Sequence, residues 1–453
     1  MTRGRAGSRL VGCLAAVLSL AACAGDGSGR GSGSDAARTP APSAGKSDPT
    51  LTATPRPTTT PSPPRALVTH ATVPQLRLDA ATARALRSGE IRNWRRLGRP
   101  AAPLRVVSAV RAVERDPRAV GVVRLDEVGP TVHVAAVAGK DPVRDHPDAV
   151  SLTVVGDVML SRGVDDPAAA LQPMTRRLRS ADITVGNLES TLSTNGSPTQ
   201  GGDSFGGTPA LLGPLRRAGF DLLSLANNHA GDYGTEALLE TVRTLQRSPI
   251  EPFGAGADRA GASRPAVIER AGVQHAFVGF NAIGETPRAT RTSPGALSVR
   301  MPPRTGPLVP ADLRHVERVV RRAARTADVV VVLPHWGTQY THRPEPIQRE
   351  VSRALVRAGA DLVVGAHPHW VQGVDLVRGV PVLHSLGNFV FDMDFLEQTM
   401  EGVALETTWW GAELKAMRLV PYRMDSTTFA PRTVRGAGIL TDVWSTSTGP
   451  FGR

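Results

Sequence analysis

The feature that most constrains this chain is a set of five short apolar segments between residues 150 and 370, each followed directly by polar residues. Stretches with helical periodicity separate the segments, so we expect an α/β domain with short buried strands. In open α/β sheets, ligands bind beyond the carboxyl ends of the strands. The polar residues at these ends are Asp157, Glu189, Asn228 with His229, His335, and His367 with His369. Together, their carboxylate, amide and imidazole groups would suit one or two divalent cations.

Local patterns place the other expected elements around these five ends. We expect strands over residues 152–155, 183–185, 222–225, 329–333 and 362–364, helices over 174–179, 209–218, 235–246, 315–324 and 344–358, and a hairpin over 266–280. In the last helix, Ile347, Val351 and Leu355 recur every four residues, as on the buried face of an amphipathic helix. The alternation of strands and helices predicts an α/β architecture.

Each polar residue at a strand end also has a structural explanation that needs no ligand. Asp157 follows a glycine and can form a turn, Glu189 can pair with an arginine, and Asn228 can occupy a left-handed turn position. His335 lies next to Trp336 and can be a packed core histidine. Five coincidences at equivalent strand ends are harder to explain in this way, so we favour a metal site.

The two histidines of the fifth end, His367 and His369, are separated only by Pro368. A buried strand that runs into a tight turn can direct two such imidazoles to one point, although the pair can also be solvent-exposed loop residues. The only cysteines are Cys13 and Cys23, both near the N-terminus. A metal site in the rest of the chain would therefore use nitrogen and oxygen ligands, which favours Mn, Fe or Zn.

Residues 1–23 have the pattern of an export signal. A basic start is followed by an apolar run over residues 10–22 that is too short to span a bilayer. The run ends in Leu-Ala-Ala before Cys23, which resembles a bacterial lipoprotein signal and implies that Cys23 becomes the lipidated first residue. The alternative is an ordinary cleaved signal peptide. We therefore expect an extracytoplasmic lipoprotein that is anchored to the membrane.

Composition divides the remainder of the chain into four parts. Residues 24–65 are rich in Gly, Ser, Thr and Pro, which predicts a disordered tether. Residues 66–148 contain the words SGEIRNW, PLRVV, AVGVVRLDEV and AGKDP, which resemble pieces of phosphate-type periplasmic binding proteins. The anion-binding segment of those proteins is replaced by SAVRAVERDPR, so we expect a small, degenerate α/β accessory domain. The main domain is expected over residues 149–430, followed by a tail over 431–453.

The net charge of +12 is carried almost entirely by arginine, since Lys46, Lys140 and Lys415 are the only lysines. This imbalance is typical of GC-rich coding, although a basic surface would also favour anionic lipid, a wall polymer or a polyacidic substrate. The sequence has no arginine cluster with interleaved aromatic residues, so we do not expect a nucleic-acid partner.

Longer motifs surround the candidate ligands. The words GDVMLSRGV, NLEST, GFDLLSLANNHAGDYG, PHWGTQY and GADLVVGAHPHWVQGVDLVRGVPVLHSLGNFVFD occur in this order. Together they resemble the capsule synthesis protein CapA family, which is associated with poly-γ-glutamate capsule production, over about residues 151–420. The resemblance implies the calcineurin-like metallophosphoesterase fold, a four-layer α/β/β/α sandwich with two mixed sheets face to face.

The resemblance also implies a role for each residue at a strand end. Asp157 and His369 would hold one metal, Glu189 would bridge, Asn228, His335 and His367 would hold a second metal, and His229 would be the general acid or the group that polarises the substrate. Met159 stands where most phosphoesterases of this fold have a histidine. The first metal site is therefore short of a ligand, which leaves one or two metals open. His384 stands where the family pattern usually has Tyr, and we interpret it as a strand residue.

Three functions remain in view. The first is an exported, lipid-anchored, metal-dependent hydrolase in the biosynthesis of a capsule or related cell-surface polymer. Its partners would be an anionic cell-surface polymer or a small ester substrate, the membrane through the lipid, and a capsule-synthesis complex. The alternative is a non-catalytic assembly factor that binds metal or polymer. A third possibility is a phosphate or envelope sensor that uses residues 66–148.

Overall fold

The computed structural model describes residues 63–452. The predicted signal sequence, the Cys23 lipidation site and residues 24–62 of the predicted tether lie outside the described residues. Within residues 63–452, every helix is too short or too polar to cross a bilayer.

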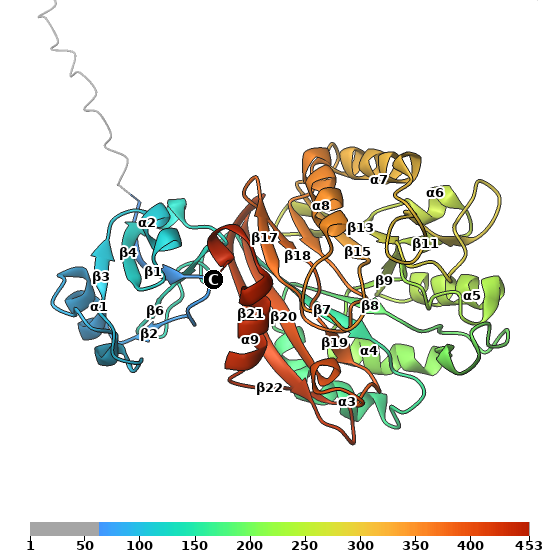
Figure 1. The fold of residues 1–453 in the computed structure, drawn as a ribbon, viewed down its shortest axis with the longest axis horizontal. Helices are drawn as coiled ribbons and strands as arrows, with labels where there is room; N and C mark the ends of the chain where they lie inside the picture. The colour runs from blue at the N-terminus through green and yellow to red at the C-terminus, as the bar shows by residue number, and fades with distance from the viewer. Residues whose placement is uncertain (1–62, 453) are drawn as a thin grey trace, which may run out of the picture. The chain divides into compact units, whose positions relative to one another are not determined.

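Two mixed sheets form the centre of the fold (Figure 1). The eight-stranded sheet has the order β10-β9-β8-β7-β20-β21-β22, and β19 pairs with β7 off this path. Its strands are β7 (Ala149–Val158), β8 (Ile183–Leu188), β9 (Leu222–Ser224), β10 (Glu251–Phe253), β19 (Asn388–Val390), β20 (Glu401–Trp410), β21 (Glu413–Met424) and β22 (Pro431–Thr433). The six-stranded sheet has the order β12-β13-β15-β16-β18-β17. Its strands are β12 (Ala266–Arg270), β13 (Val273–Asn281), β15 (Val329–His335), β16 (Leu362–Val364), β17 (Val374–Val377) and β18 (Val380–Leu383).

Helices cover the outer face of each sheet. Figure 1 shows α7 and α8 over the six-stranded sheet, with α3 and α4 beside the eight-stranded sheet. The larger helices are α3 (Pro167–Leu178), α4 (Leu212–Ala218), α5 (Gly234–Gln246), α7 (Pro310–Ala323) and α8 (Pro346–Ala358). The short elements of this region are α6 (Arg259–Ala262), β11 (Ala255–Gly256) and β14 (Gly295–Ala296).

The alternation of side chains along the strands explains the layers. On β15, Val329 and Val331 belong to the apolar core between the two sheets, whereas Val330 and Val332 belong to the core beneath α7 and α8. On β7, Leu152 and Val154 likewise face the other sheet, and the residues that follow join the core beneath α3, α4 and α5. Successive side chains of a strand point to opposite faces, so each sheet is buried on both sides. The predicted four-layer α/β/β/α sandwich is confirmed.

Helix α3 is longer than its sequence pattern indicated. Helix α3 begins at Pro167 instead of residue 174, because the Asp166 side chain accepts hydrogen bonds from the N–H groups of Ala168 and Ala169. Its first turns are made of alanines, which give no strong apolar periodicity. The hairpin expected over residues 266–280 is present as β12 and β13.

Residues 63–148 form a separate small sheet. Its order is β3-β4-β1-β5, from β1 (Arg65–His70), β3 (Arg105–Val107), β4 (Ala119–Arg124) and β5 (Val132–Val134). The remaining elements are β2 (Arg77–Leu78), β6 (Ala136–Val137), α1 (Ala80–Arg87) and α2 (Val110–Arg115). Trp410 on β20 contacts this part of the chain, since its Nε1 donates to the carbonyl of Val143 at 2.9 Å and its ring stacks on His146.

The segment after residue 430 continues the sandwich. Strand β22 pairs with β21, and α9 (Ala437–Thr446) places Ile439, Val443 and Trp444 in the core between the sheets. The residues that we assigned to a tail therefore contribute a strand and a helix to the main fold.

Candidate metal centre

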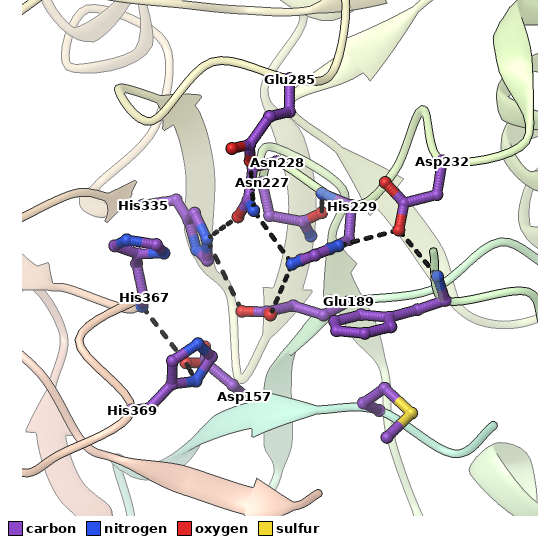
Figure 2. Close-up of polar contacts among 12 residues, drawn as sticks. Asp157, Glu189, Asn227, Asn228, His229, Asp232, Glu285, His335, His367 and His369 are labelled. Carbon is purple, nitrogen blue, oxygen red and sulfur yellow. Dashed lines mark hydrogen bonds and ion pairs between the residues drawn. The ribbon is translucent and has the colours of Figure 1, made fainter. Parts of the chain in front are cut away.

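The predicted ligands lie together at the carboxyl ends of the parallel strands of both sheets (Figure 2). Asp157 is the penultimate residue of β7, Glu189 follows β8, and His335 is the last residue of β15. Potential ligand atoms of these three residues all lie within 4.8 Å of one another. The residues at this centre that we identified from sequence are Asp157, Glu189, Asn228, His229, His335, His367 and His369, and none is more than 6% exposed.

Asn187, which sequence reasoning missed, holds the two carboxylates. Its Nδ2 donates to Oδ1 of Asp157 at 2.8 Å and to Oε1 of Glu189 at 2.9 Å. Its own Oδ1 accepts a hydrogen bond from Nδ2 of Asn227 at 3.0 Å. An amide has only two N–H groups, so the remaining oxygen atoms of both carboxylates are left to other partners.

The Asn228 amide links the centre to a more exposed loop. Nε2 of His335 lies 2.7 Å from Oδ1 of Asn228 and 3.6 Å from Oε1 of Glu189. The Asn228 Nδ2 donates to Oε2 of Glu285 at 2.7 Å, as Figure 2 shows. Glu285 thus orients the amide so that its oxygen faces His335. No local sequence signal indicated this role, because Glu285 lies 57 positions further along the chain.

His229 is held by a carboxylate and an aromatic ring. Its Nδ1 lies 2.8 Å from Oδ2 of Asp232, and its Nε2 lies 2.9 Å from Nδ2 of Asn228 and 4.0 Å from Oε2 of Glu189. The imidazole stacks on Phe205 with 3.9 Å between ring centroids. Asp232 also accepts the backbone N–H of Phe205 at 2.7 Å. Nε2 of His229 is therefore directed to the centre, while Asp232 would stabilise a proton on the ring.

The loop after β16 places His367 and His369 in left-handed backbone conformations, with φ of 96° and 59°. Such angles are unfavourable for residues with a side chain and occur at functional sites. The backbone N–H of His367 donates to Oδ2 of Asp157 at 3.2 Å. Nδ1 of His369 lies 2.8 Å from Oδ1 of Asn388 and 3.6 Å from Oδ2 of Asp157.

Burial controls the protonation of these groups. Burial raises the pKa of Asp157, and burial together with the Asp157 carboxylate raises the pKa of Glu189 well above its usual value. Burial, followed by the neighbouring histidines, lowers the pKa of both His335 and His367 well below the usual value. Neutral imidazoles retain a lone pair, which is the form that binds metals.

Three buried atoms at this centre have no hydrogen-bond partner among the residues that the structure describes. They are Oε2 of Glu189 and both ring nitrogens of His367. Each unsatisfied buried polar atom costs about 1–3 kcal/mol. A cation coordinated by these atoms would remove that cost, and the nitrogen and oxygen donors suit Mn, Fe or Zn. The residues present therefore fit a divalent metal.

Met159, which stands where most phosphoesterases of this fold have a histidine, and His384, which departs from the family pattern, both lie outside this cluster. Met159 is fully buried in the core beneath α3, α4 and α5, and its sulfur accepts the N–H of Ser161. His384 follows β18, with its Nε2 2.9 Å from Oδ2 of Asp375. Neither side chain adds a ligand to the centre.

The layers and the buried cluster define an α/β/β/α sandwich protein with a site that could bind a metal. Residues 151–393, more than half of the chain, match the profile of the family described as bacterial capsule synthesis protein PGA_cap. The protein therefore belongs to this family of capsule synthesis proteins.

Curated relatives carry corresponding names. The chain is 30% identical over 258 residues to the "PGA biosynthesis protein CapA" of Bacillus subtilis (strain 168), covering 54% of this chain and 64% of that protein. It is 30% identical over 256 residues to the "Capsule biosynthesis protein CapA" of Bacillus anthracis, covering 54% and 60%. The match thus spans less than two thirds of either relative. Among solved structures, a hypothetical protein from Thermus thermophilus aligns with a TM-score of 0.40 and 18% identity, covering 60% of this chain and 99% of that chain.

Proposed function

We propose that this protein is a metal-dependent hydrolase that acts on an anionic cell-surface polymer during capsule biosynthesis. One observation carries the proposal: Oε2 of Glu189 and both ring nitrogens of His367 are buried beside Asp157 and His335, and none of these atoms has a hydrogen-bond partner within residues 63–452. Membership in the capsule synthesis family supports a cell-surface polymer as the substrate, since relatives are named for PGA or capsule biosynthesis.

The residues divide into a metal-holding set and a proton-transferring pair. The metal-holding residues would be Asp157, Glu189, Asn228, His335, His367 and His369. A bound divalent cation would polarise the scissile group as a Lewis acid. His229 would donate a proton from Nε2 to the leaving group, because Asp232 on its Nδ1 stabilises the protonated ring.

We further propose that the protein is exported and anchored by lipid at Cys23, with residues 24–65 as the tether. The sequence pattern of residues 1–23 supports this proposal. A Cys23→Ser variant is expected to move from the membrane fraction to the soluble extracytoplasmic fraction and to lose incorporation of a labelled fatty acid. Retention of both properties would contradict the anchor.

The second candidate function is a non-catalytic factor that binds metal or polymer during capsule assembly. The position of Met159 favours it, because that side chain is buried in the apolar core and leaves the first metal position one ligand short. A bound metal without turnover would be the signature of this role.

Metal analysis combined with a hydrolysis assay separates these functions. The purified protein, after incubation with Mn²⁺, Fe²⁺ or Zn²⁺, is expected to retain one or two metals per chain and to hydrolyse members of a panel of phosphoesters, esters and γ-glutamyl amides. The variants His367→Ala and Glu189→Ala are expected to lose metal. His229→Ala should keep metal while turnover falls about 100-fold or more.

The control is His315→Ala, which removes an imidazole outside the cluster and should change neither property. Failure of the wild-type protein to retain any metal would refute the proposed centre. Metal retention without hydrolysis of any substrate would support the non-catalytic alternative.

A further inference from the structure

Two arginines approach the buried centre, each through one intervening residue. Nη2 of Arg304 donates to Oε1 of Glu285 at 2.7 Å, and the other oxygen of Glu285 accepts from Asn228. The guanidinium of Arg162 lies 4.4 Å from the ring centroid of Phe205, and that ring stacks on His229. One side chain, Glu285, thus separates Arg304 from the predicted metal ligand Asn228. One ring, Phe205, separates Arg162 from the predicted acid His229.

The two arginines are held by different partners at the cluster. Figure 2 places Glu285, the partner of Arg304, on the side away from Asp157 and His369. The Arg162 guanidinium instead lies over the Phe205 ring, and its Nε and Nη2 donate to Asp392. Separate carboxylates, Glu285 and Asp392, therefore position the two guanidinium groups.

Both arginines retain donors that can bind a ligand. Arg162 uses Nε and Nη2 on Asp392, and Arg304 uses Nη2 on Glu285. Within residues 63–452, Nη1 of each arginine has no hydrogen-bond partner. Their side chains are 30% and 48% exposed, in contrast to the buried ligands. The carboxylates thus orient two guanidinium groups at the edge of the site and leave part of each donor set free.

The backbone supports a functional explanation for this arrangement. Arg162 and Glu285 have φ of 56° and 60°, the unfavourable left-handed region that His367 and His369 also occupy. A residue with a side chain in this region costs about 1–3 kcal/mol. Simple surface ion pairs, which contribute at most about 1 kcal/mol, would not offset that cost. Four strained residues around one site indicate that their placement serves the site.

We propose that Arg162 and Arg304 are specificity-determining residues, each of which binds one carboxylate of a chain that carries carboxylates on both sides of the cleaved bond. This inference rests on the proposed hydrolytic function of the same centre. A single anionic group at the centre would need only the metal, whereas two separated guanidinium groups match a polymer with repeated carboxylates.

Matched substrates test the inference. The first is an oligomer of γ-linked glutamate, and the second is the same oligomer with every α-carboxylate replaced by a carboxamide. The metal-loaded wild-type protein is expected to prefer the acidic oligomer. In Arg162→Gln and in Arg304→Gln, this preference, expressed as the ratio of kcat/KM values, should fall about tenfold or more, mainly through KM. In the double variant, the preference for the acidic oligomer should fall about a hundredfold, because the two positions act independently.

The matched control is Arg353→Gln, which changes an exposed arginine on α8 that is not among the residues assigned to the site. It should leave the preference unchanged. Metal content and thermal midpoints are measured for each variant, and Arg162→Lys and Arg304→Lys replace any glutamine variant that does not fold. An equal loss on both oligomers, or no change in preference, would overturn the inference.

The inference and the proposed function fail in different ways. If the wild-type protein hydrolyses neither oligomer, the proposed function fails for this substrate class. Equilibrium binding of the two oligomers to the metal-loaded protein then tests the arginines directly. Tighter binding of the acidic oligomer, weakened about tenfold in each variant, would support the inference. Equal binding of both oligomers would refute it.

Discussion

The charges at the centre depend on single residues and on their burial. Asp157 and Glu189 are fully buried, and within residues 63–452 no arginine or lysine contacts either carboxylate. Two ionised carboxylates that are buried together without a cation are strongly unfavourable, which agrees with the raised pKa of both groups. A divalent cation is the compensating charge that this arrangement lacks.

The pair formed by His229 and Asp232 gives a test at this scale. In Asp232→Asn, the negative charge that stabilises a protonated His229 is removed, so we expect kcat to fall about 100-fold or more while metal content stays unchanged. Steady-state kinetics and metal analysis of the same preparations provide the measurement. Asp258→Asn, which changes a carboxylate that only caps α6, should keep full kcat. Wild-type kcat in Asp232→Asn would argue against the assigned role.

At the scale of elements, the turn between β16 and the histidine loop is tightly packed. A Cβ on Gly365 would lie 2.1 Å from the carbonyl oxygen of His384 and 2.4 Å from Nε1 of Trp336. That carbonyl also accepts the Trp336 N–H at 3.1 Å, so backbone and indole are fixed against each other. The close approach is what lets the loop return toward the centre.

Gly365→Ala should therefore destabilise the protein by about 3 kcal/mol or more, because a backbone atom must move to make room. Metal affinity should fall with it, since the same displacement shifts His367. Gly438→Ala serves as the control, as its new Cβ meets nothing within 4 Å and lies in α9. We expect this control to stabilise the protein by about 0.5–1 kcal/mol. Chemical unfolding measures both variants, and equal stabilities would contradict the packing argument.

A buried carboxylate connects three elements behind the site. Oδ2 of Asp375 on β17 accepts from Nε of Arg349 on α8 at 2.9 Å and lies 2.9 Å from Nε2 of His384, while Oδ1 accepts from Thr448. Burial acts to raise the pKa of Asp375, but the interactions with His384, Thr448 and Arg349 together hold that pKa well below its usual value. The charged form is therefore the one that stabilises the fold.

The sign of the pH dependence follows from this shift. A carboxyl group whose pKa is lowered in the folded state contributes its full stability above the unfolded value of about 3.9, and loses it as pH falls further. Asp375→Asn should cost about 2–3 kcal/mol at pH 7, with a smaller difference from wild type below about pH 4. Urea unfolding across this range is the measurement. Asp126→Asn, at an exposed ion pair that water screens, should show a much smaller difference, and a pH-independent loss in Asp375→Asn would oppose the assignment.

At the scale of the whole molecule, the centre joins the two sheets. Asp157 and Glu189 come from the eight-stranded sheet, whereas His335 and the His367 loop come from the six-stranded sheet. A metal held by both sets would connect the layers and add its binding free energy to folding.

Metal should thus stabilise the entire sandwich. At a free metal concentration 100 times the dissociation constant, we expect a gain of about 2.7 kcal/mol in unfolding free energy, which a chelator should abolish. His367→Ala should show little response to metal or chelator. Chemical unfolding of wild type and variant with Mn²⁺ and with chelator measures the effect. The same gain in both proteins would place the stabilising metal elsewhere.

Much of the fold was predictable because its signals are local. The apolar segments that end at Asp157, Glu189 and His335 are strands, and their alternation with amphipathic helices indicated the α/β architecture. The four layers were expected only from the resemblance to the capsule synthesis family. The start of α3 was missed because an alanine-rich first turn has no periodic signal. The strand and helix after residue 430 were missed for a similar reason, since their apolar residues are few and are buried only by distant partners.

The amino-acid sequence by itself determined the order of the strands along the chain and the candidate ligands, because strand periodicity and polar strand ends are read over a few neighbouring residues. The family was recognised from the longer motifs around those ligands, which are also local in the sequence. Only the tertiary structure decided which side chains support that set. Asn187 meets Asp157, Glu285 meets Asn228, and Phe205 meets His229 through contacts between segments that are separate in the sequence. The ring nitrogens of His367, which lack a hydrogen-bond partner in the described part of the chain, also depend on tertiary structure, since burial by two packed sheets, and no local pattern, removes them from water.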